Sequence, residues 1–184
     1  MDNVVRASQL LASILRHDKP AGVKVDREGW ARVSDLIAFT ADNTPALTQE
    51  IIERAVAEND KKRFAFSDDG QHVRALQGHT RKDVQLTFAS KVPPVELFHG
   101  TAQRSVAAIR KKGLVPMDRH HVHLSPDAKT ARIVGQRHDR KNPPVILVID
   151  TKAMYAAGHK FYLSENGVWL TDTVPPRFIK EPAQ

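Results

Sequence analysis

The sequence predicts an α+β protein whose two parts differ in character. Helical periodicity dominates the first part and ends in one β-hairpin, whereas short strands alternate with short helices in the second. Between them, the Val-Pro-Pro of residues 92–94 is typical of a linker, because proline interrupts both helices and sheets. We therefore expect two lobes, residues 1–90 and residues 91–184.

Three segments of the first lobe are expected to be helices. Residues 4–15 place apolar side chains near one helical face, and Pro20 prevents any continuation. A second helix is expected to begin with Ser34 as its N-cap. The third, residues 48–59, is expected to begin with Thr48 as its N-cap.

A β-hairpin is expected after these helices. Apolar and polar residues alternate in 64–66 and again in 73–75, and Asp69 and Gly70 between them form a turn sequence. Three helices followed by a hairpin resemble a winged-helix module, and we expect that arrangement for the first lobe.

The second lobe alternates between strand and helix patterns. Its expected strands lie at residues 95–98, 121–125, 143–150 and 177–181, with a further pair inside 160–172. Its expected helices lie at 102–113, 126–135 and 151–158. We expect Gly113 to end the first of these helices and Ser125 to cap the second.

The composition is that of a globular protein, with 41% hydrophobic and 27% charged residues, and not of a disordered chain. Cysteine is absent, which excludes disulfides, thiolate zinc sites and a cysteine nucleophile. No secretion signal and no apolar run of membrane-spanning length is evident in the sequence. We expect a soluble, cytoplasmic protein.

The positive charge is confined to the second lobe. Residues 1–90 hold 13 Lys or Arg and 13 Asp or Glu, whereas residues 91–184 hold 15 and 8, so the whole net charge of +7 lies there. A basic half beside a neutral half predicts a polyanionic ligand on the second lobe. A basic, solvated surface without a ligand explains the same charge and stays open as the alternative.

Three histidines fall within four positions just before the expected strand ends at Ser125. In a strand, His121 and His123 share one face. Two histidines alone do not make a zinc site, because zinc needs three or four ligands. No HExxH motif is present. We therefore expect no metal, and a histidine that binds a hydroxyl or a phosphate.

Arginines at three separated places suit phosphate binding, because a guanidinium can donate hydrogen bonds to two phosphate oxygens at once. Arg16 and His17 end the first helix, Arg63 precedes the hairpin, and Arg119 precedes the histidine-rich strand. The alternatives are a helix C-terminus stabilised by cations for Arg16 and His17, and plain surface charges for the other two. Neither a G-x-G-x-x-G nor a Walker A motif is present, so a Rossmann or P-loop nucleotide site is not supported.

The chain resembles a known family along nearly its whole length. The segments that carry the resemblance are LASILRHDKP, DREGWARVSDL, KKRFAF, RALQGHT, LFHGT, IRKKGLVPMDRHHVHLS, VGQRH, VILVID and ENGVWLTDTVPPRFI. In combination and in this order they are similar to the NAD-dependent RNA 2′-phosphotransferases. The resemblance implies a winged-helix lobe that binds the RNA 2′-phosphate and an ADP-ribosyltransferase-like lobe that binds NAD⁺.

The resemblance also implies a reaction in two steps. An internal RNA 2′-phosphate, as at a tRNA splice junction, attacks the nicotinamide ribose of NAD⁺ and expels nicotinamide. The ribose 2″-hydroxyl then attacks the phosphorus and releases 2′-OH RNA and ADP-ribose 1″,2″-cyclic phosphate. NAD⁺ is thus a co-substrate, no metal is required, and we expect a monomer.

The family's functional residues map onto this sequence by its motifs. The Arg-His-Arg-Arg set that handles the phosphate falls on Arg16, His17, Arg63 and Arg119, with Arg119 expected to serve mainly the second step. Whether His17 binds phosphate or transfers a proton is left open. The residues expected to bind NAD⁺ are His99, Gly100, Thr101, His123, Leu124, Ser125, Arg137 and Val168. Val168 is expected at the position where protein-modifying relatives carry a catalytic glutamate. Glu165 lies nearby in the sequence, so which of the two residues takes that position is left open.

Two other functions stay open at this point. An ADP-ribosyltransferase that caps nucleic-acid phosphate ends would use the same NAD⁺ contacts and stop after the first step. A winged-helix nucleic-acid-binding protein without chemistry is the second alternative, although its first lobe should then be basic.

Overall fold

The computed structural model describes residues 3–42, 46–58 and 62–180. The chain divides into two compact units, Met1–Thr87 and Phe88–Gln184, each with its own apolar core. Both units combine short helices with small antiparallel sheets, so the expected α+β class is confirmed. The expected lobe division after residue 90 falls near this boundary, and what each lobe binds stays a prediction.

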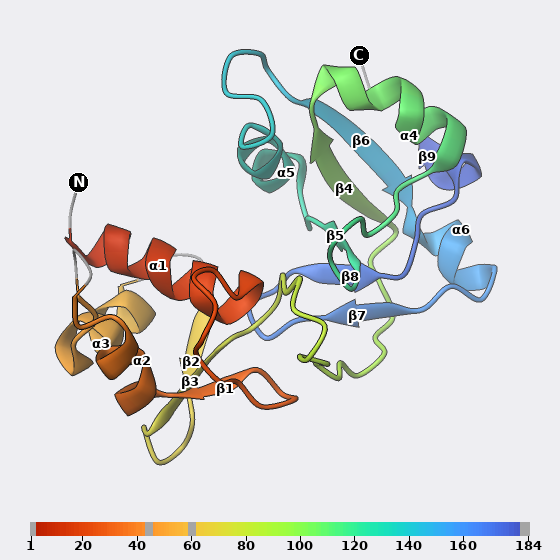
Figure 1. Ribbon diagram of the computed structural model, residues 1–184. Coiled ribbons are helices and arrows are strands. Elements are labelled where there is room, and N and C mark those ends of the chain that lie inside the picture. Colours follow the sequence, from red (N-terminus) through yellow and green to blue (C-terminus); the bar gives the residue numbers. More distant parts are fainter. Residues whose placement is uncertain (1–2, 43–45, 59–61, 181–184) are drawn as a thin grey trace. The chain divides into compact units, whose positions relative to one another are not determined.

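The described residues of the first unit form three helices and three short strands (Figure 1). Its elements in chain order are α1 (Asn3–His17), β1 (Trp30–Arg32), α2 (Val33–Phe39), α3 (Gln49–Ala57), β2 (Phe64–Phe66) and β3 (His72–Ala75). The strands form an antiparallel sheet in the order β1-β3-β2. The three expected helices and the hairpin are therefore present, and β1 is an additional edge strand that the sequence did not reveal.

Apolar stripes on the helices build the core of the first unit. Leu11, Ile14 and Leu15 of α1 are fully buried, as are Ile52 of α3 and Val73 of β3. Their spacing on α1 puts one face of the helix against α3 and the sheet, as an amphipathic helix requires. The polar end of α1, with Arg16 and His17, lies at the edge of this core.

One of the two expected N-caps in this unit is confirmed. Thr48 accepts a hydrogen bond from the Ile51 backbone N–H at 3.2 Å and caps α3. The prediction for Ser34 is wrong, because α2 already begins at Val33 and Ser34 lies inside its first turn. The backbone N–H of Val33 bonds to the carbonyl of Gln71 at 2.9 Å instead, so a tertiary contact sets the start of α2.

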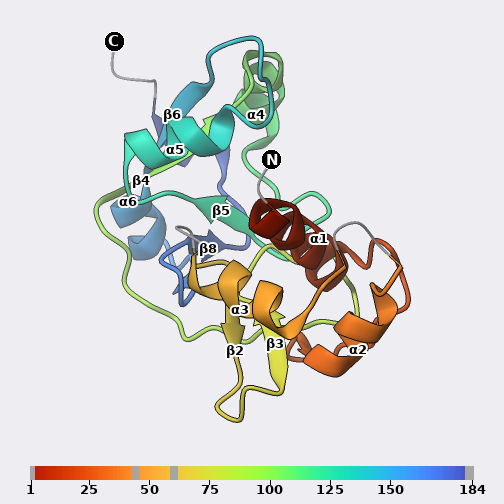
Figure 2. The same cartoon turned by 90° about the vertical axis from the view of Figure 1, so that its left-hand side faces the viewer.

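The second unit consists of two three-stranded antiparallel sheets with helices packed on them (Figures 1 and 2). The first sheet has the order β4-β6-β9 and the second the order β5-β8-β7. Its strands are β4 (Glu96–Thr101), β5 (Val122–Leu124), β6 (Val145–Asp150), β7 (Phe161–Leu163), β8 (Trp169–Thr171) and β9 (Ile179–Lys180). Its helical segments are η1 (Gln103–Ser105), α4 (Val106–Lys112), α5 (Ala128–Gly135), α6 (Thr151–Ala156) and η2 (Pro176–Phe178).

Ser125 has a different role from the expected helix cap. Its backbone exchanges hydrogen bonds with Phe98 of β4, at 2.7 and 2.9 Å, and so continues the strand β5. Asp127 caps α5 instead, by accepting from the Thr130 N–H at 2.7 Å. Gly113 ends α4 with φ at 80°, as expected from the sequence. The Phe98–Ser125 bridge joins the two sheets at the point where the predicted NAD⁺ residues lie.

Helix α5 packs directly on strand β4 through two glycines (Figure 2). A Cβ on Gly100 would lie 1.9 Å from the backbone oxygen of Ala131, and one on Gly135 would lie 2.8 Å from the carbonyl carbon of Gly100. Both glycines are therefore required by the packing of backbone on backbone. The family resemblance assigned Gly100 to NAD⁺ binding; the contact with α5 is a second and independent reason for a glycine there.

Gly100→Ala should lower the free energy of unfolding by about 3 kcal/mol, because the new methyl group meets backbone that has no free space to move into. Denaturant unfolding of the two proteins measures the difference. Gly167→Ala is the matched control, since nothing lies within 4 Å of the new Cβ and only the positive φ of 78° is strained. The control should lose about 1 kcal/mol, and an equal loss for both variants would contradict the packing argument.

Candidate active-site residues in the two units

Arg16 and His17 are the last two residues of α1, where the helix carbonyls have no donors within the helix. The segment after β3, residues 77–83, supplies those donors, and we refer to it as the capping loop. The Arg16 carbonyl accepts from the Thr80 N–H at 2.9 Å and from the Arg81 N–H at 3.3 Å. The His17 Nδ1 lies 3.0 Å from the Thr80 hydroxyl oxygen. The capping loop thereby fixes the backbone of Arg16 and the ring of His17.

Arg81 fastens the capping loop to the chain that follows α1. Its buried guanidinium donates to both carboxylate oxygens of Asp83, at 2.7 and 3.1 Å, and to Asp18 at 2.9 Å. The hydrogen bonds and charge of Asp83 raise the pKa of Arg81, and Arg81 lowers the pKa of Asp83 in return. Paired with two carboxylates in this way, Arg81 is a structural arginine that holds α1 and the loop together.

Arg63 lies directly before β2 and is tied to the same segment of chain. Its carbonyl accepts from the Leu76 N–H at 2.9 Å, which extends the β2–β3 ladder by one step beyond the Phe64–Ala75 pair. The chain then runs from Leu76 into the capping loop. The structure therefore attaches Arg16, His17 and Arg63 to one short stretch that leaves β3.

In the second unit, His99 of β4 is held in one tautomer. Its Nδ1 lies 3.1 Å from the backbone oxygen of His123, and since a carbonyl only accepts, Nδ1 carries the proton. Loss of solvation lowers the pKa of His99, the bond to His123 opposes this, and the charges of His138 and Arg119 lower it further. With its proton on Nδ1, the neutral form of His99 presents an Nε2 lone pair that can accept a hydrogen bond, as from a sugar hydroxyl.

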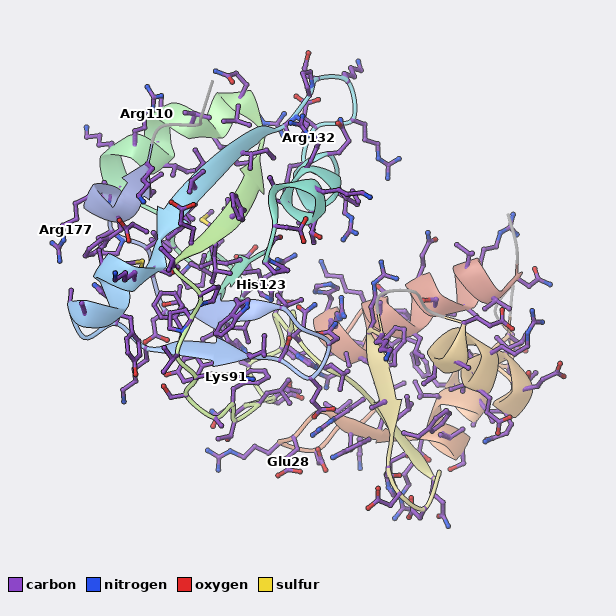
Figure 3. The ribbon with its side chains drawn as sticks, turned by 180° about the vertical axis from the view of Figure 1, so that it is seen from behind. Glu28, Lys91, Arg110, His123, Arg132 and Arg177 are labelled. Carbon is purple, nitrogen blue, oxygen red and sulfur yellow. The ribbon has the colours of Figure 1, made fainter. Side chains whose placement is uncertain are left out.

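The other predicted NAD⁺ residues lie around the junction of β4 and β5. Thr101 and Leu124 are buried, and Ser125 pairs with Phe98 as described above. His123, labelled in Figure 3, is half-buried on β5 between Val122 and Leu124.

Val168 directly precedes β8, whose Trp169 stands opposite Leu124 of β5. Its backbone N–H donates to the Ser164 hydroxyl at 3.0 Å, which closes the turn between β7 and β8. Glu165 is exposed in that turn. The half-buried Val168, and not Glu165, therefore continues β8 beside the β5 residues.

Basic side chains lie near His99, and we call Arg104, Arg119, Arg137 and His138 the cationic cluster after its three arginines. The pKa of Arg119 is lowered, first by desolvation of its guanidinium and then by the charge of Arg137. The residue as a whole is nevertheless exposed. Desolvation, followed by the charges of Arg119, Arg104 and Arg137, lowers the pKa of His138. Arg104 also donates to the His138 backbone oxygen at 2.9 Å. The charges of Arg119 and Arg137, near enough for one to lower the pKa of the other, favour an anionic ligand, whereas Arg104 also pairs with Asp139 at 3.5 Å.

Arg104 and His138 are the members of this cluster that the sequence did not assign. His138 follows the predicted Arg137 directly, and that adjacency was the available signal. Arg104 gave none, because it comes 34 residues before the His138 it contacts. Both Arg137 and His138 come just after the end of α5, so the docking of α5 on β4 determines where they lie.

Neither a metal site nor a membrane helix is found in the part of the chain that the structure describes. Residues 3–42, 46–58 and 62–180 contain no group of three or more His, Cys, Asp or Glu able to hold a metal ion. No helix among the same residues has the length and apolar character needed to cross a bilayer.

Comparisons with known proteins give a consistent result. The family model described as "RNA 2'-phosphotransferase, Tpt1 / KptA family" matches residues 2–173. A protein of Pseudomonas fluorescens named "Probable RNA 2'-phosphotransferase" is 52% identical over 174 residues, which are 94% of this chain and 94% of that protein. Relatives of the same name in Burkholderia lata and Fusobacterium nucleatum are 48% and 47% identical, over 99% and 98% of this chain and 93% and 99% of their own.

Asp83→Asn should lower the free energy of unfolding by about 1 kcal/mol at neutral pH, because it removes a charged but half-exposed partner of Arg81. The pKa of Asp83 is lowered from its ordinary 3.8, so its contribution is complete above that value and disappears as the pH falls through the lowered pKa. Urea unfolding at pH 7 and at successively lower pH measures the difference. Asp68→Asn, in the exposed turn after β2, is the control and should be neutral; a pH-independent loss in Asp83→Asn would contradict the ion-pair account.

Proposed function

The chain belongs to the RNA 2'-phosphotransferase, Tpt1 / KptA family, and on that premise we propose that it transfers an internal RNA 2′-phosphate to NAD⁺. The first step joins a 2′-phosphate oxygen to the nicotinamide ribose and expels nicotinamide. In the second, the ribose 2″-hydroxyl attacks the phosphorus, and the RNA leaves with a free 2′-OH. The other product is ADP-ribose 1″,2″-cyclic phosphate.

The phosphate acts as the nucleophile in the first step and as the electrophile in the second. It therefore needs binding groups that stabilise its negative charge in both steps. Arg16, His17 and Arg63 suit the first role, because forked guanidinium donors orient a dianion and compensate for lost water. Arg119 suits the second, in which negative charge grows on the phosphoryl oxygens during transesterification. No residue is required to form a covalent bond with the substrate.

The observation that carries the NAD⁺ part of the proposal is the cationic cluster beside a neutral His99. NAD⁺ presents a pyrophosphate, which Arg137 is suited to bind, and ribose hydroxyls, which the Nε2 lone pair of His99 is suited to accept. Gly100 and Thr101 end β4, and His123 and Leu124 lie on β5 with Ser125 directly after it. Val168 lies just before β8, which pairs with β5, and completes the predicted set. A doubly charged ligand relieves the repulsion that the cluster builds up.

The architecture of the proposal is a winged-helix lobe for RNA and an ADP-ribosyltransferase-like lobe for NAD⁺. The helices and three-stranded sheet of the first unit and the two small sheets of the second are compatible with it. Cytoplasmic location, a monomeric state and independence of metal stay predictions.

The proposal is tested by incubating the protein with NAD⁺ and an oligoribonucleotide that carries one internal 2′-phosphate. We expect NAD⁺-dependent loss of the phosphate and release of nicotinamide, unchanged by a chelator. ADP-ribosylated RNA that persists without further change would favour an end-capping ADP-ribosyltransferase. No nicotinamide release under any condition would favour a nucleic-acid-binding protein without chemistry.

Arg119→Ala should slow the second step more than the first, because its guanidinium is assigned to charge that develops in transesterification. The removal of one such donor costs about 100-fold or more in the step it serves. Rapid quenching and gel separation should then show ADP-ribosylated RNA building up where the wild type shows little. Arg110→Ala, in the last turn of α4, is a matched control; an equal slowing of both steps in Arg119→Ala would contradict the division of labour.

A further inference from the structure

Thr80 of the capping loop makes three polar contacts at the end of α1, and all of them involve Arg16 or His17. Its N–H donates to the Arg16 carbonyl at 2.9 Å, and its hydroxyl donates to the same carbonyl at 3.4 Å. The hydroxyl oxygen lies 3.0 Å from Nδ1 of His17. A threonine 63 residues away in sequence is thus a hydrogen-bond partner of the His17 ring.

The direction of the hydrogen bond follows from the single proton of the Thr80 hydroxyl, which is donated to the Arg16 carbonyl and leaves the oxygen to accept from Nδ1–H of His17. A histidine that binds a phosphate dianion does so best as an imidazolium, in which both ring nitrogens are donors. The Thr80 oxygen must then accept from the Nδ1–H, and the hydroxyl proton needs an acceptor of its own. The Arg16 carbonyl at the negative end of the α1 dipole is that acceptor.

We propose that Thr80 is a positioning residue that accepts the Nδ1–H of His17 and so makes Nε2 the nitrogen that faces the RNA 2′-phosphate. The phosphate part of this statement rests on the proposed function, whereas the tautomer does not. Both roles considered for His17, binding the phosphate and moving a proton, use the same nitrogen, Nε2. The hydroxyl therefore fixes which atom of His17 works, whichever step it serves.

Arg81 keeps Thr80 in place for this purpose. Its guanidinium is bound to Asp18 after α1 and to Asp83 at the end of the capping loop. It also lies 3.5 Å from the Ile14 carbonyl and 3.4 Å from the Val23 carbonyl. Arg81 thereby anchors the capping loop directly after Thr80, whose hydroxyl contacts the ring of His17.

The tautomer is measured without any substrate. In the full chain labelled with ¹⁵N-histidine, two-bond ¹H–¹⁵N spectra distinguish Nδ1–H from Nε2–H, and His17→Gln identifies the signal of His17. We expect neutral His17 to carry its proton on Nδ1 in the wild type and in Thr80→Ser. In Thr80→Val, which keeps the shape and removes the hydroxyl, we expect the Nε2–H form to increase. Wild-type His17 with its proton on Nε2, or a Thr80→Val spectrum equal to the wild type, would overturn the proposal.

The consequence for the reaction is measured with NAD⁺ and the 2′-phosphorylated oligoribonucleotide. Thr80→Val should lower kcat at least 10-fold, because the ring of His17 is no longer held in place, and Thr80→Ser should stay within about twofold of the wild type. Thr40→Val is the structural control, since that buried hydroxyl bonds to Leu36 and Leu47 at the end of α2. It should lower Tm and leave kcat unchanged.

The two sets of data separate the two proposals. A wild type that releases no nicotinamide would refute the proposed function, while the spectra still decide the role of Thr80. A Thr80→Val protein with wild-type kcat, in a preparation that is active, would refute the positioning role alone.

Discussion

The second unit brings positively charged side chains near one another, and this electrostatic constraint characterises its candidate site. Arg119 and Arg137 are near enough for one charge to lower the pKa of the other, and both lower the pKa of His138. Such repulsion lowers stability in the empty protein and turns into binding energy when an anion enters. The neutral His99 at the same place adds an acceptor without adding to the repulsion.

Arginines in the two units are distinguished by their partners. Arg81 in the first unit lies between two carboxylates and has its pKa raised, which is the environment of a structural ion pair. Arg119 has its pKa lowered, and the charged neighbour responsible is another arginine. The first environment is complete within the protein, whereas the second favours a ligand. Charge environment therefore separates a structural arginine from a candidate binding arginine where residue type does not.

Local sequence signals predicted the elements well and the contacts between them poorly. Thr48, Gly113 and the Asp69–Gly70 turn were recognised because each acts on its own few residues. Strand β1 was missed because three residues carry little periodicity and its partner is β3, about forty residues later. Ser125 was misassigned because pairing with Phe98 on another strand outweighed its capacity to cap a helix.

The same division applies to the candidate site. Motif resemblance assigned Arg16, His17 and Arg119, but nothing in the local sequence connects His17 with Thr80 or Arg104 with His138. Those contacts arise where the capping loop returns to α1 and where α5 docks on β4 through Gly100. Tertiary packing, not local propensity, selects the tautomer of His99, brings Thr80 to the ring of His17 and gathers the cationic cluster.

The fate of the phosphorus atom tests the central claim most directly. An oligoribonucleotide with ³²P in its internal 2′-phosphate is incubated with the protein and NAD⁺, and the labelled products are separated. We predict that the label appears in ADP-ribose 1″,2″-cyclic phosphate and that none appears without NAD⁺. Label released as inorganic phosphate, or retained on the RNA, would contradict the account.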